Sequence, residues 1–212
     1  MPFDFKKEFK EFYAPKATPQ LVKVPPMHFC AVRGKGDPNE PKGEYKTSVE
    51  LVYAMSYALK MSYKGEYKIA GFYEYVVPPL EGFWWQDGVC GGVDYAKKAD
   101  FCFISLIRLP EFIAPKDFEW AKTQVAKKKA LPYHKAEFLH YDEGLCVQCL
   151  HTGSYDTEPE SLAKMHEFAR AKGYEIDINH TRFHHEIYLS DPRKCELSKL
   201  KTILRVPIKA KV

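Results

Sequence analysis

A chain of 212 residues with 45% hydrophobic residues is long enough to bury a globular core, which argues against disorder. Its 32 basic and 28 acidic residues leave a net charge of +4 without a basic patch, so we expect no direct contact with nucleic acid. The densest basic run, Lys127 to Lys129, fits the solvated last turn of a helix. No membrane-length apolar stretch or signal region occurs, so we expect a cytoplasmic protein that does not contact membranes.

Metal and cofactor binding are not expected from the cysteines and histidines. Cys146 and Cys149 lie three residues apart on a predicted strand and would face opposite sides. His180 and His184 share a face but lie roughly 13 Å apart along an extended chain, which is too far for one zinc ion. The aromatic content of 15% could line a pocket for a flat ligand or form ordinary core, and composition leaves both readings open.

The first half of the chain reads as strand, helix, strand, strand. Residues 1–20 suit an irregular lead or a short helix, and residues 21–33 are extended. A capping box, Thr47 to Glu50, predicts a helix that runs to about Tyr63. Strands are expected at residues 72–77 and 101–109, separated by an irregular rim that contains Trp84 and Trp85. A separate amphipathic helix follows at residues 115–130, with Phe118, Ala121 and Val125 facing inward.

The second half repeats this pattern. Strands are predicted at 137–139, 145–151, 182–189 and 202–207, and a second capping box, Thr157 to Glu160, starts a helix. We therefore predict an α+β fold, a tandem strand-helix-strand-strand repeat in a single domain over residues 1–212. The two units, about 21–110 and 136–208, are joined by the helix at 115–130. Antiparallel sheets would leave a ligand groove between the units, with helices on the outer faces.

Glu186 is the residue around which a site is most readily built. In the strand at 182–189, alternation places His184, Glu186 and Tyr188 on one face, and places Phe183, His185, Ile187 and Leu189 on the other, which would face helices. A carboxylate in an aromatic strand is either solvated or held in a cavity to meet a cation or a reacting water. The strand alone leaves both possibilities open.

The strand at 72–77 is expected to be the counterpart of the Glu186 strand and to meet it in the groove. We predict Glu186 and Tyr73 as catalytic residues. The predicted ligand-binding residues are Trp84, Trp85, Tyr75, Tyr133, Tyr188 and Glu81. Of the tandem tryptophans, one is expected in the core and one in the pocket wall. Simple packing remains the alternative for the tyrosines, and a plain turn remains the alternative for Glu81.

Three motifs carry a resemblance to a known family. They are Pro78-Pro-Leu-Glu-Gly-Phe-Trp-Trp85, His151-Thr-Gly-Ser-Tyr-Asp156 with Glu158-Pro159, and His184-His-Glu-Ile-Tyr-Leu-Ser-Asp-Pro-Arg193. Together with the tandem repeat, these motifs make the chain resemble the GyrI-like small-molecule-binding superfamily. It looks most like the stand-alone branch that includes cyclopropanoid cyclopropyl hydrolases.

The resemblance implies a cleft between the units in which Glu186 contacts the ligand. It implies a detoxifying hydrolase that opens the strained cyclopropane of DNA-alkylating cyclopropyl dienones with water, without metal or cofactor, and the expected partner is a planar aromatic small molecule. The alternative is a non-catalytic binder or sensor of amphipathic aromatic cations. Such proteins are often labelled transcription regulators, but we expect no fused DNA-binding domain in this chain. Monomer and homodimer remain equally open.

Overall fold

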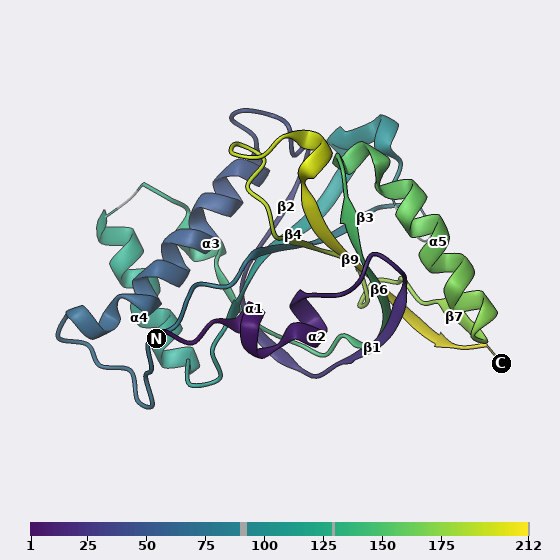
Figure 1. Ribbon diagram of the computed structural model, residues 1–212. Coiled ribbons are helices and arrows are strands. Elements are labelled where there is room, and N and C mark those ends of the chain that lie inside the picture. Colours follow the sequence, from purple (N-terminus) through teal and green to yellow (C-terminus); the bar gives the residue numbers. More distant parts are fainter. Residues whose placement is uncertain (90–92, 129, 212) are drawn as a thin grey trace.

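The computed structural model describes residues 1–89, 93–128 and 130–211. The helices are α1 (Phe5–Glu8), α2 (Lys10–Tyr13), α3 (Glu44–Lys60), α4 (Pro115–Lys128) and α5 (Glu158–Ala171). The strands are β1 (Gln20–Val24), β2 (Met27–Lys35), β3 (Leu80–Gln86), β4 (Phe101–Leu109), β5 (Glu137–Tyr141), β6 (Gly144–Thr152), β7 (Tyr174–Ile176), β8 (His184–Tyr188) and β9 (Lys201–Ala210) (Figure 1).

One antiparallel sheet holds the molecule together. Its order is β1-β6-β9-β8-β3-β4-β2-β5, and β7 pairs with β9 beside this path. The order is symmetric about the β8–β3 pair, with β2-α3-β3-β4 on one side and β6-α5-β8-β9 on the other. The α+β fold with a repeated strand-helix-strand-strand unit is therefore confirmed, as one continuous sheet rather than separate sheets.

The first strand of each half lies on the edge of the other half. β1 precedes β2 in the chain but pairs with β6, and β5 precedes β6 but pairs with β2. Pro25 and Pro26 fall between β1 and β2, where no ladder hydrogen bond is required of them. The crossing strands tie the two halves to each other beyond the central β3–β8 contact.

Helices cover both faces of the sheet. On one face, α3 and α4 pack in a common cluster with β2 and β4, and α5 packs with β6 and β9. On the other face, Phe5 and Phe12 from α1 and α2 pack with Phe83 and Ile187. The Phe183 side of β8 thus faces the N-terminal helices, whereas the Glu186 side faces the cavity bordered by α3 and α5.

The predicted strand at residues 72–77 is wrong. This segment pairs only at Tyr75, which forms a bridge with Phe3. The strand of the first unit that pairs with β8 is β3, which lies in the stretch predicted as an irregular rim. Pro78 and Pro79 precede β3 rather than interrupt it, because a proline lacks the N–H that a central strand must donate.

The first capping box is also wrong. α3 begins at Glu44 with Gly43 as its N-cap, so Thr47 lies inside the helix. At α5 the N-cap is Thr157, but its hydroxyl donates to the carbonyl of Ser154 at 2.8 Å instead of capping the helix. The linking helix is confirmed as α4, and Phe118, Ala121 and Val125 are buried. α4 ends with Lys127 and Lys128, and Lys129 lies outside the described residues.

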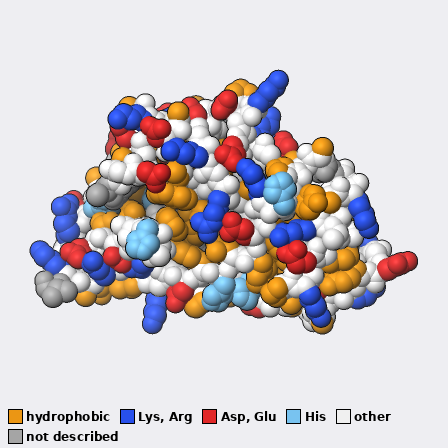
Figure 2. Space-filling model, turned by 180° about the vertical axis from the view of Figure 1, so that it is seen from behind, with side chains coloured by type: hydrophobic (Ala, Val, Ile, Leu, Met, Phe, Trp, Pro, Cys, Tyr) orange, Lys and Arg blue, Asp and Glu red, His pale blue; other side chains and the backbone are white. Residues whose placement is uncertain are grey.

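The surface carries charges of both signs. Figure 2 shows lysine, arginine and acidic side chains interspersed on one face, with apolar side chains between them. Among the described helices, none combines the length and the apolar character needed to cross a bilayer.

Candidate active and ligand-binding site

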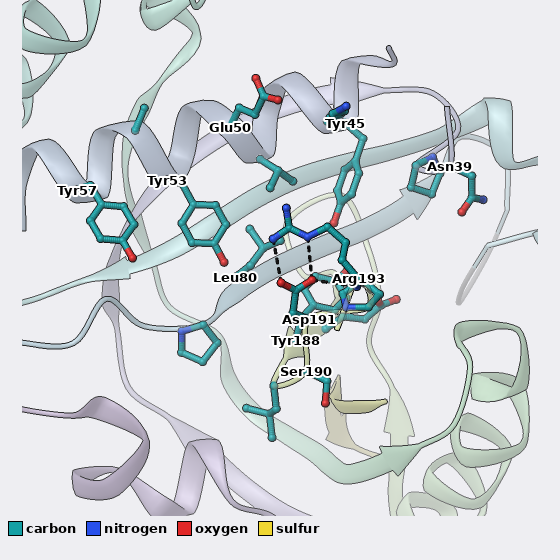
Figure 3. A pocket seen from close by; sticks show the side chains of 18 of the residues that line it. Asn39, Tyr45, Glu50, Tyr53, Tyr57, Leu80, Tyr188, Ser190, Asp191 and Arg193 are labelled. Atoms are coloured by element: carbon teal, nitrogen blue, oxygen red, sulfur yellow. Dashed lines mark hydrogen bonds and ion pairs between the residues drawn. The ribbon is translucent and has the colours of Figure 1, made fainter. Parts of the chain in front are cut away.

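A cavity of about 1520 Å³ lies on the α3 and α5 side of the sheet, above the neighbouring strands β3 and β8. α3 supplies Tyr45, Tyr53 and Tyr57 to its lining, and these rings project from the helix on the side of the loop that carries Asp191 and Arg193 (Figure 3). None of the three tyrosines is among the site residues predicted from the sequence. Their spacing of four and eight residues is a stripe along one helix face, and this signal would have identified them.

Glu186 lines this cavity and is held by hydrogen bonds from its own strand. Glu186 is only 9% exposed to solvent. The Tyr188 hydroxyl donates to Glu186 Oε2 at 2.8 Å, and Trp84 Nε1 donates to the Tyr188 oxygen at 2.8 Å. His184 Nε2 lies 3.2 Å from Glu186 Oε1. The structure thus places the carboxylate at the end of a short indole-to-phenol-to-carboxylate chain, with its orientation fixed from β3 and β8.

Gly82 makes this arrangement possible. It lies opposite Glu186 in the β3–β8 register. A Cβ atom at this position would lie 2.7 Å from Trp84 Nε1 and 3.0 Å from the Tyr188 oxygen. Such contacts are too short for a side chain, so the close approach of the indole and the phenol requires glycine.

The phenols around Glu186 stay protonated at neutral pH. Burial, supported by the negative charge of Glu186, raises the pKa of Tyr188 well above its ordinary value. Burial likewise raises the pKa values of Tyr45 and Tyr95, and it raises that of Tyr155 to about 12. The neutral hydroxyl groups of Tyr45 and Tyr155 can therefore donate a hydrogen bond to a bound ligand, whereas the hydroxyl proton of Tyr188 is already donated to Glu186.

A second buried acid, Glu158, lies beside Glu186. It comes from the first turn of α5 and is 1% exposed. Ligand atoms of Glu158, His184 and Glu186 all lie within 4.8 Å of one another. From the sequence, Glu158 belongs to a capping box and to one of the motifs of the family resemblance, and it is not predicted as a site residue, because nothing local shows that α5 begins above the centre of the sheet. Two carboxylates and an imidazole are also donor types that divalent metals accept.

Two of the predicted tyrosines lie away from the cavity. Tyr73 packs against Phe3 and Phe112, with ring centroids 5.3 and 4.8 Å apart, and is 37% exposed. Tyr75 is buried next to Phe5 in the cluster under the N-terminal helices. Because residues 72–77 pair with the N-terminal segment and not with β8, the structure does not bring Tyr73 to Glu186.

Three further predicted residues also lie elsewhere. Trp85 points to the opposite face of β3 from Trp84 and packs on Phe183, with ring centroids 4.9 Å apart. Trp84 therefore lies in the cavity wall and Trp85 in the core. Glu81 is buried on that opposite face. Tyr133 is 40% exposed in a 3₁₀ turn and does not line the cavity. Of the predicted site residues, the structure assembles Glu186, Tyr188 and Trp84 at one site.

The opposite face of β3 and β8 carries a buried ionic network. His185 Nε2 lies 2.9 Å from Glu81 Oε2, and His185 Nδ1 lies 3.0 Å from Glu143 Oε1. Arg205 donates to Glu143 at 3.0 Å, and Tyr13 donates to Glu81 at 3.1 Å. Every charge has a partner of opposite sign, as burial requires. The network braces the strands that carry Glu186 and ties α2 to them.

Comparison with known proteins identifies a family and several similar structures. A family model described as GyrI-like small molecule binding domain matches residues 17–209. A crystal structure described as a hydrolase from Listeria innocua is 42% identical, with a TM-score of 0.88 over 98% of this chain and 100% of that chain. An uncharacterized conserved protein from the same organism is 43% identical, with a TM-score of 0.91 over the same shares.

More distant likeness concerns the fold alone. The EcmrR C-terminal domain is 12% identical and superposes with a TM-score of 0.54 over 92% of this chain and 98% of that domain. No curated protein matches the chain.

Proposed function

Because this chain belongs to the family of GyrI-like small molecule binding domains, we propose that its cavity binds a planar aromatic electrophile and that Glu186 directs water onto it. The reaction is hydrolysis of a cyclopropane conjugated to a dienone, the strained group of DNA-alkylating cyclopropanoids. One observation carries the proposal: Glu186 is fixed by Tyr188 and Trp84 inside a cavity lined by tyrosine rings. The likeness to a structure described as a hydrolase supports it.

The chemistry follows from the side chains present. Rings of Trp84 and the α3 tyrosines offer faces for stacking, which holds a flat ligand with its reactive carbon near Glu186. Glu186 accepts a proton from water while the water oxygen forms a bond to a methylene carbon of the cyclopropane. The ring C–C bond breaks, and its electron pair moves through the dienone to the carbonyl oxygen. A neutral phenol such as Tyr45 donates a hydrogen bond to that oxygen as it gains charge.

Replacing Glu186 by glutamine tests this role. Glu186→Gln keeps the shape of the side chain but removes the proton acceptor, so kcat should fall by about 10²- to 10⁴-fold with a smaller change in KM. Loss of dienone absorbance would be followed with a synthetic spirocyclopropyl cyclohexadienone, and mass spectrometry would identify the water adduct. Glu160→Gln, at an exposed position of α5, is the matched control. Wild-type turnover by Glu186→Gln would contradict the assignment.

A non-catalytic binder or sensor of amphipathic aromatic cations is the second candidate. The observation that favours it is a buried carboxylate bordered by aromatic rings, which suits a hydrophobic cation through charge and cation–π contacts. The two functions differ in the fate of the ligand. Quantitative recovery of the intact cyclopropyl compound after tight binding would favour the binder, and catalytic formation of the water adduct would favour the hydrolase.

A further inference from the structure

Glu158 and Glu186 form an unusual pair of acids. Glu158 enters from α5 and Glu186 from β8, and their carboxylate oxygens come within 4.8 Å of each other. Both residues are buried, and Glu158 Oε1 has no hydrogen-bond partner. Two carboxylates so placed repel each other when both are ionised, and burial strengthens the repulsion. The pair therefore needs a proton or a cation.

Among the basic side chains around the pair that the structure describes, His184 is already in contact with Glu186, its Nε2 lying 3.2 Å from Glu186 Oε1. The groups that face the pair come from α3, β3, the 3₁₀ turns at Tyr95–Asp100 and Tyr155–Thr157, α5 and β8: Tyr45, Trp84, Tyr95, Lys98, Tyr155, Asp156, His166, His184 and Tyr188. Lys98 is paired with Asp156 at 3.1 Å. Burial, followed by the charge of Arg170, lowers the pKa of His166, which favours its neutral form.

The two acids are not equivalent. Glu186 accepts a hydrogen bond from Tyr188 and lies next to His184 Nε2, whereas Glu158 Oε1 has no hydrogen-bond partner. Burial, followed by the negative charge of Glu186, raises the pKa of Glu158 well above its ordinary value. Glu158 is thus the member that holds a proton.

We propose that Glu158 and Glu186 hold one proton between them, so that the pair carries a single negative charge in the empty cavity and releases the proton when a hydrophobic cation binds. The inference rests on the small-molecule-binding part of the proposed function and not on hydrolysis. What it adds is the release of a proton on binding, and hence a pH dependence of the affinity. Affinity for a cation without ionisable groups should rise with pH, because less work is then needed to remove the proton.

Infrared spectroscopy tests the shared proton in the unliganded protein. Wild-type protein in D₂O at neutral pH should show the C=O stretching band of a buried protonated carboxyl group. Glu158→Gln should lose this band, and Glu160→Gln, at an exposed position of the same helix, should keep it. Absence of the band in wild type would overturn the proposal. A divalent metal ion bound in equal amount to the purified protein, detected by elemental analysis, would also overturn it.

Calorimetry tests the exchange of the proton for a cation. The probe is tetraphenylphosphonium, which has no titratable group, and titrations in buffers of different ionisation enthalpy count the protons released. Wild type should release about one proton per cation bound, and Glu158→Gln should release none. Binding to wild type without proton release would overturn the exchange. A protein that shows the band and releases the proton, yet hydrolyses no cyclopropyl dienone, would keep this inference and lose the proposed hydrolysis.

Discussion

At the scale of single residues, Gly82 determines how closely the indole and phenol of the site approach each other. Gly82→Ala places a methyl group where Trp84 Nε1 and the Tyr188 hydroxyl now lie, so one of the two side chains must move. We expect a loss of stability of about 1–3 kcal/mol, together with weaker ligand binding, because the contact that orients Glu186 is disturbed.

Gly65→Ala is the matched control for this substitution. A Cβ atom at Gly65 meets its nearest neighbour, the carbonyl of Ser62, at an ordinary 3.6 Å. Chemical denaturation and the tryptophan fluorescence of ligand titrations would be compared for both variants. Equal behaviour of the two variants would mean that the Trp84 and Tyr188 contact does not depend on Gly82.

Some residues of the site can be predicted from their neighbours in the sequence, and others cannot. Period-two alternation in the strand at 182–189 put Glu186 and Tyr188 on one face, and this requires only neighbouring residues. Glu158 could not be predicted in the same way. Its role depends on where α5 begins relative to β8, and that position is set by packing between elements far apart in the sequence.

At the scale of elements, the capping box from Thr47 to Glu50 is a misleading local pattern, because α3 begins at Glu44. Thr47 occupies the second turn, and its hydroxyl reaches back to the carbonyl of Gly43 at 3.5 Å. Thr47→Ala should therefore change stability by less than about 0.5 kcal/mol, whereas loss of a true N-cap costs about 1 kcal/mol.

Ser48→Ala provides the contrast for Thr47→Ala. The buried Ser48 hydroxyl lies 2.7 Å from the hydroxyl of Ser105 on β4. Removing it leaves Ser105 without this partner, so the expected cost is about 1–3 kcal/mol. Urea denaturation of both variants measures the difference, and a larger loss for Thr47→Ala than for Ser48→Ala would show that the helix begins where the capping box placed it.

The wrong prediction of a strand at residues 72–77, like that of the N-cap at Thr47, came from a local pattern that tertiary contacts override. Residues 72–77 have the alternation of a strand, but their partner is the N-terminal Phe3 rather than the sheet. β3 contains Gly82 and follows two prolines, and these features are typical of a loop when the sequence is considered alone. The glycine is required by Trp84 and Tyr188, which is a tertiary reason that no window of the sequence contains.

At the scale of the whole molecule, the repeat was predictable and the exchange of strands was not. Helical faces such as Met55 with Leu59, and Met165 with Ala169, are periodic in the sequence, and these side chains are buried. The pairing of β1 with β6 and of β5 with β2 has no periodic signal, because every strand offers the same backbone groups to any edge.

The buried network beneath the site connects the halves and the N-terminal helices, and it makes stability depend on pH. Burial alone would lower the pKa of His185, but the carboxylates of Glu143 and Glu81 outweigh it and raise the pKa above its ordinary value. Burial also opposes the ionisation of Glu143, but His185 and Arg205 outweigh it and lower its pKa to about 2.

The two shifts act at opposite ends of the pH scale. The contribution of protonated His185 is complete below its ordinary pKa of 6.5 and is lost as the pH rises through the raised value. The contribution of ionised Glu143 is complete above its ordinary pKa of 4.5 and is lost as the pH falls through about 2. Stability from this network should therefore be greatest between pH 4.5 and 6.5.

His185→Gln tests the alkaline limb of the pH dependence, which is the fall in stability as the pH rises and His185 loses its proton. Between about pH 6 and 10, the wild type should lose about 1–3 kcal/mol as His185 gives up its proton and leaves the buried carboxylates uncompensated. The glutamine variant should be less stable near pH 6 and should show a flatter alkaline limb, because its side chain does not titrate. Urea midpoints across this range would be compared with those of His134→Gln, which removes an exposed histidine. An alkaline limb that stays as steep in His185→Gln as in the wild type would assign the pH dependence to other groups.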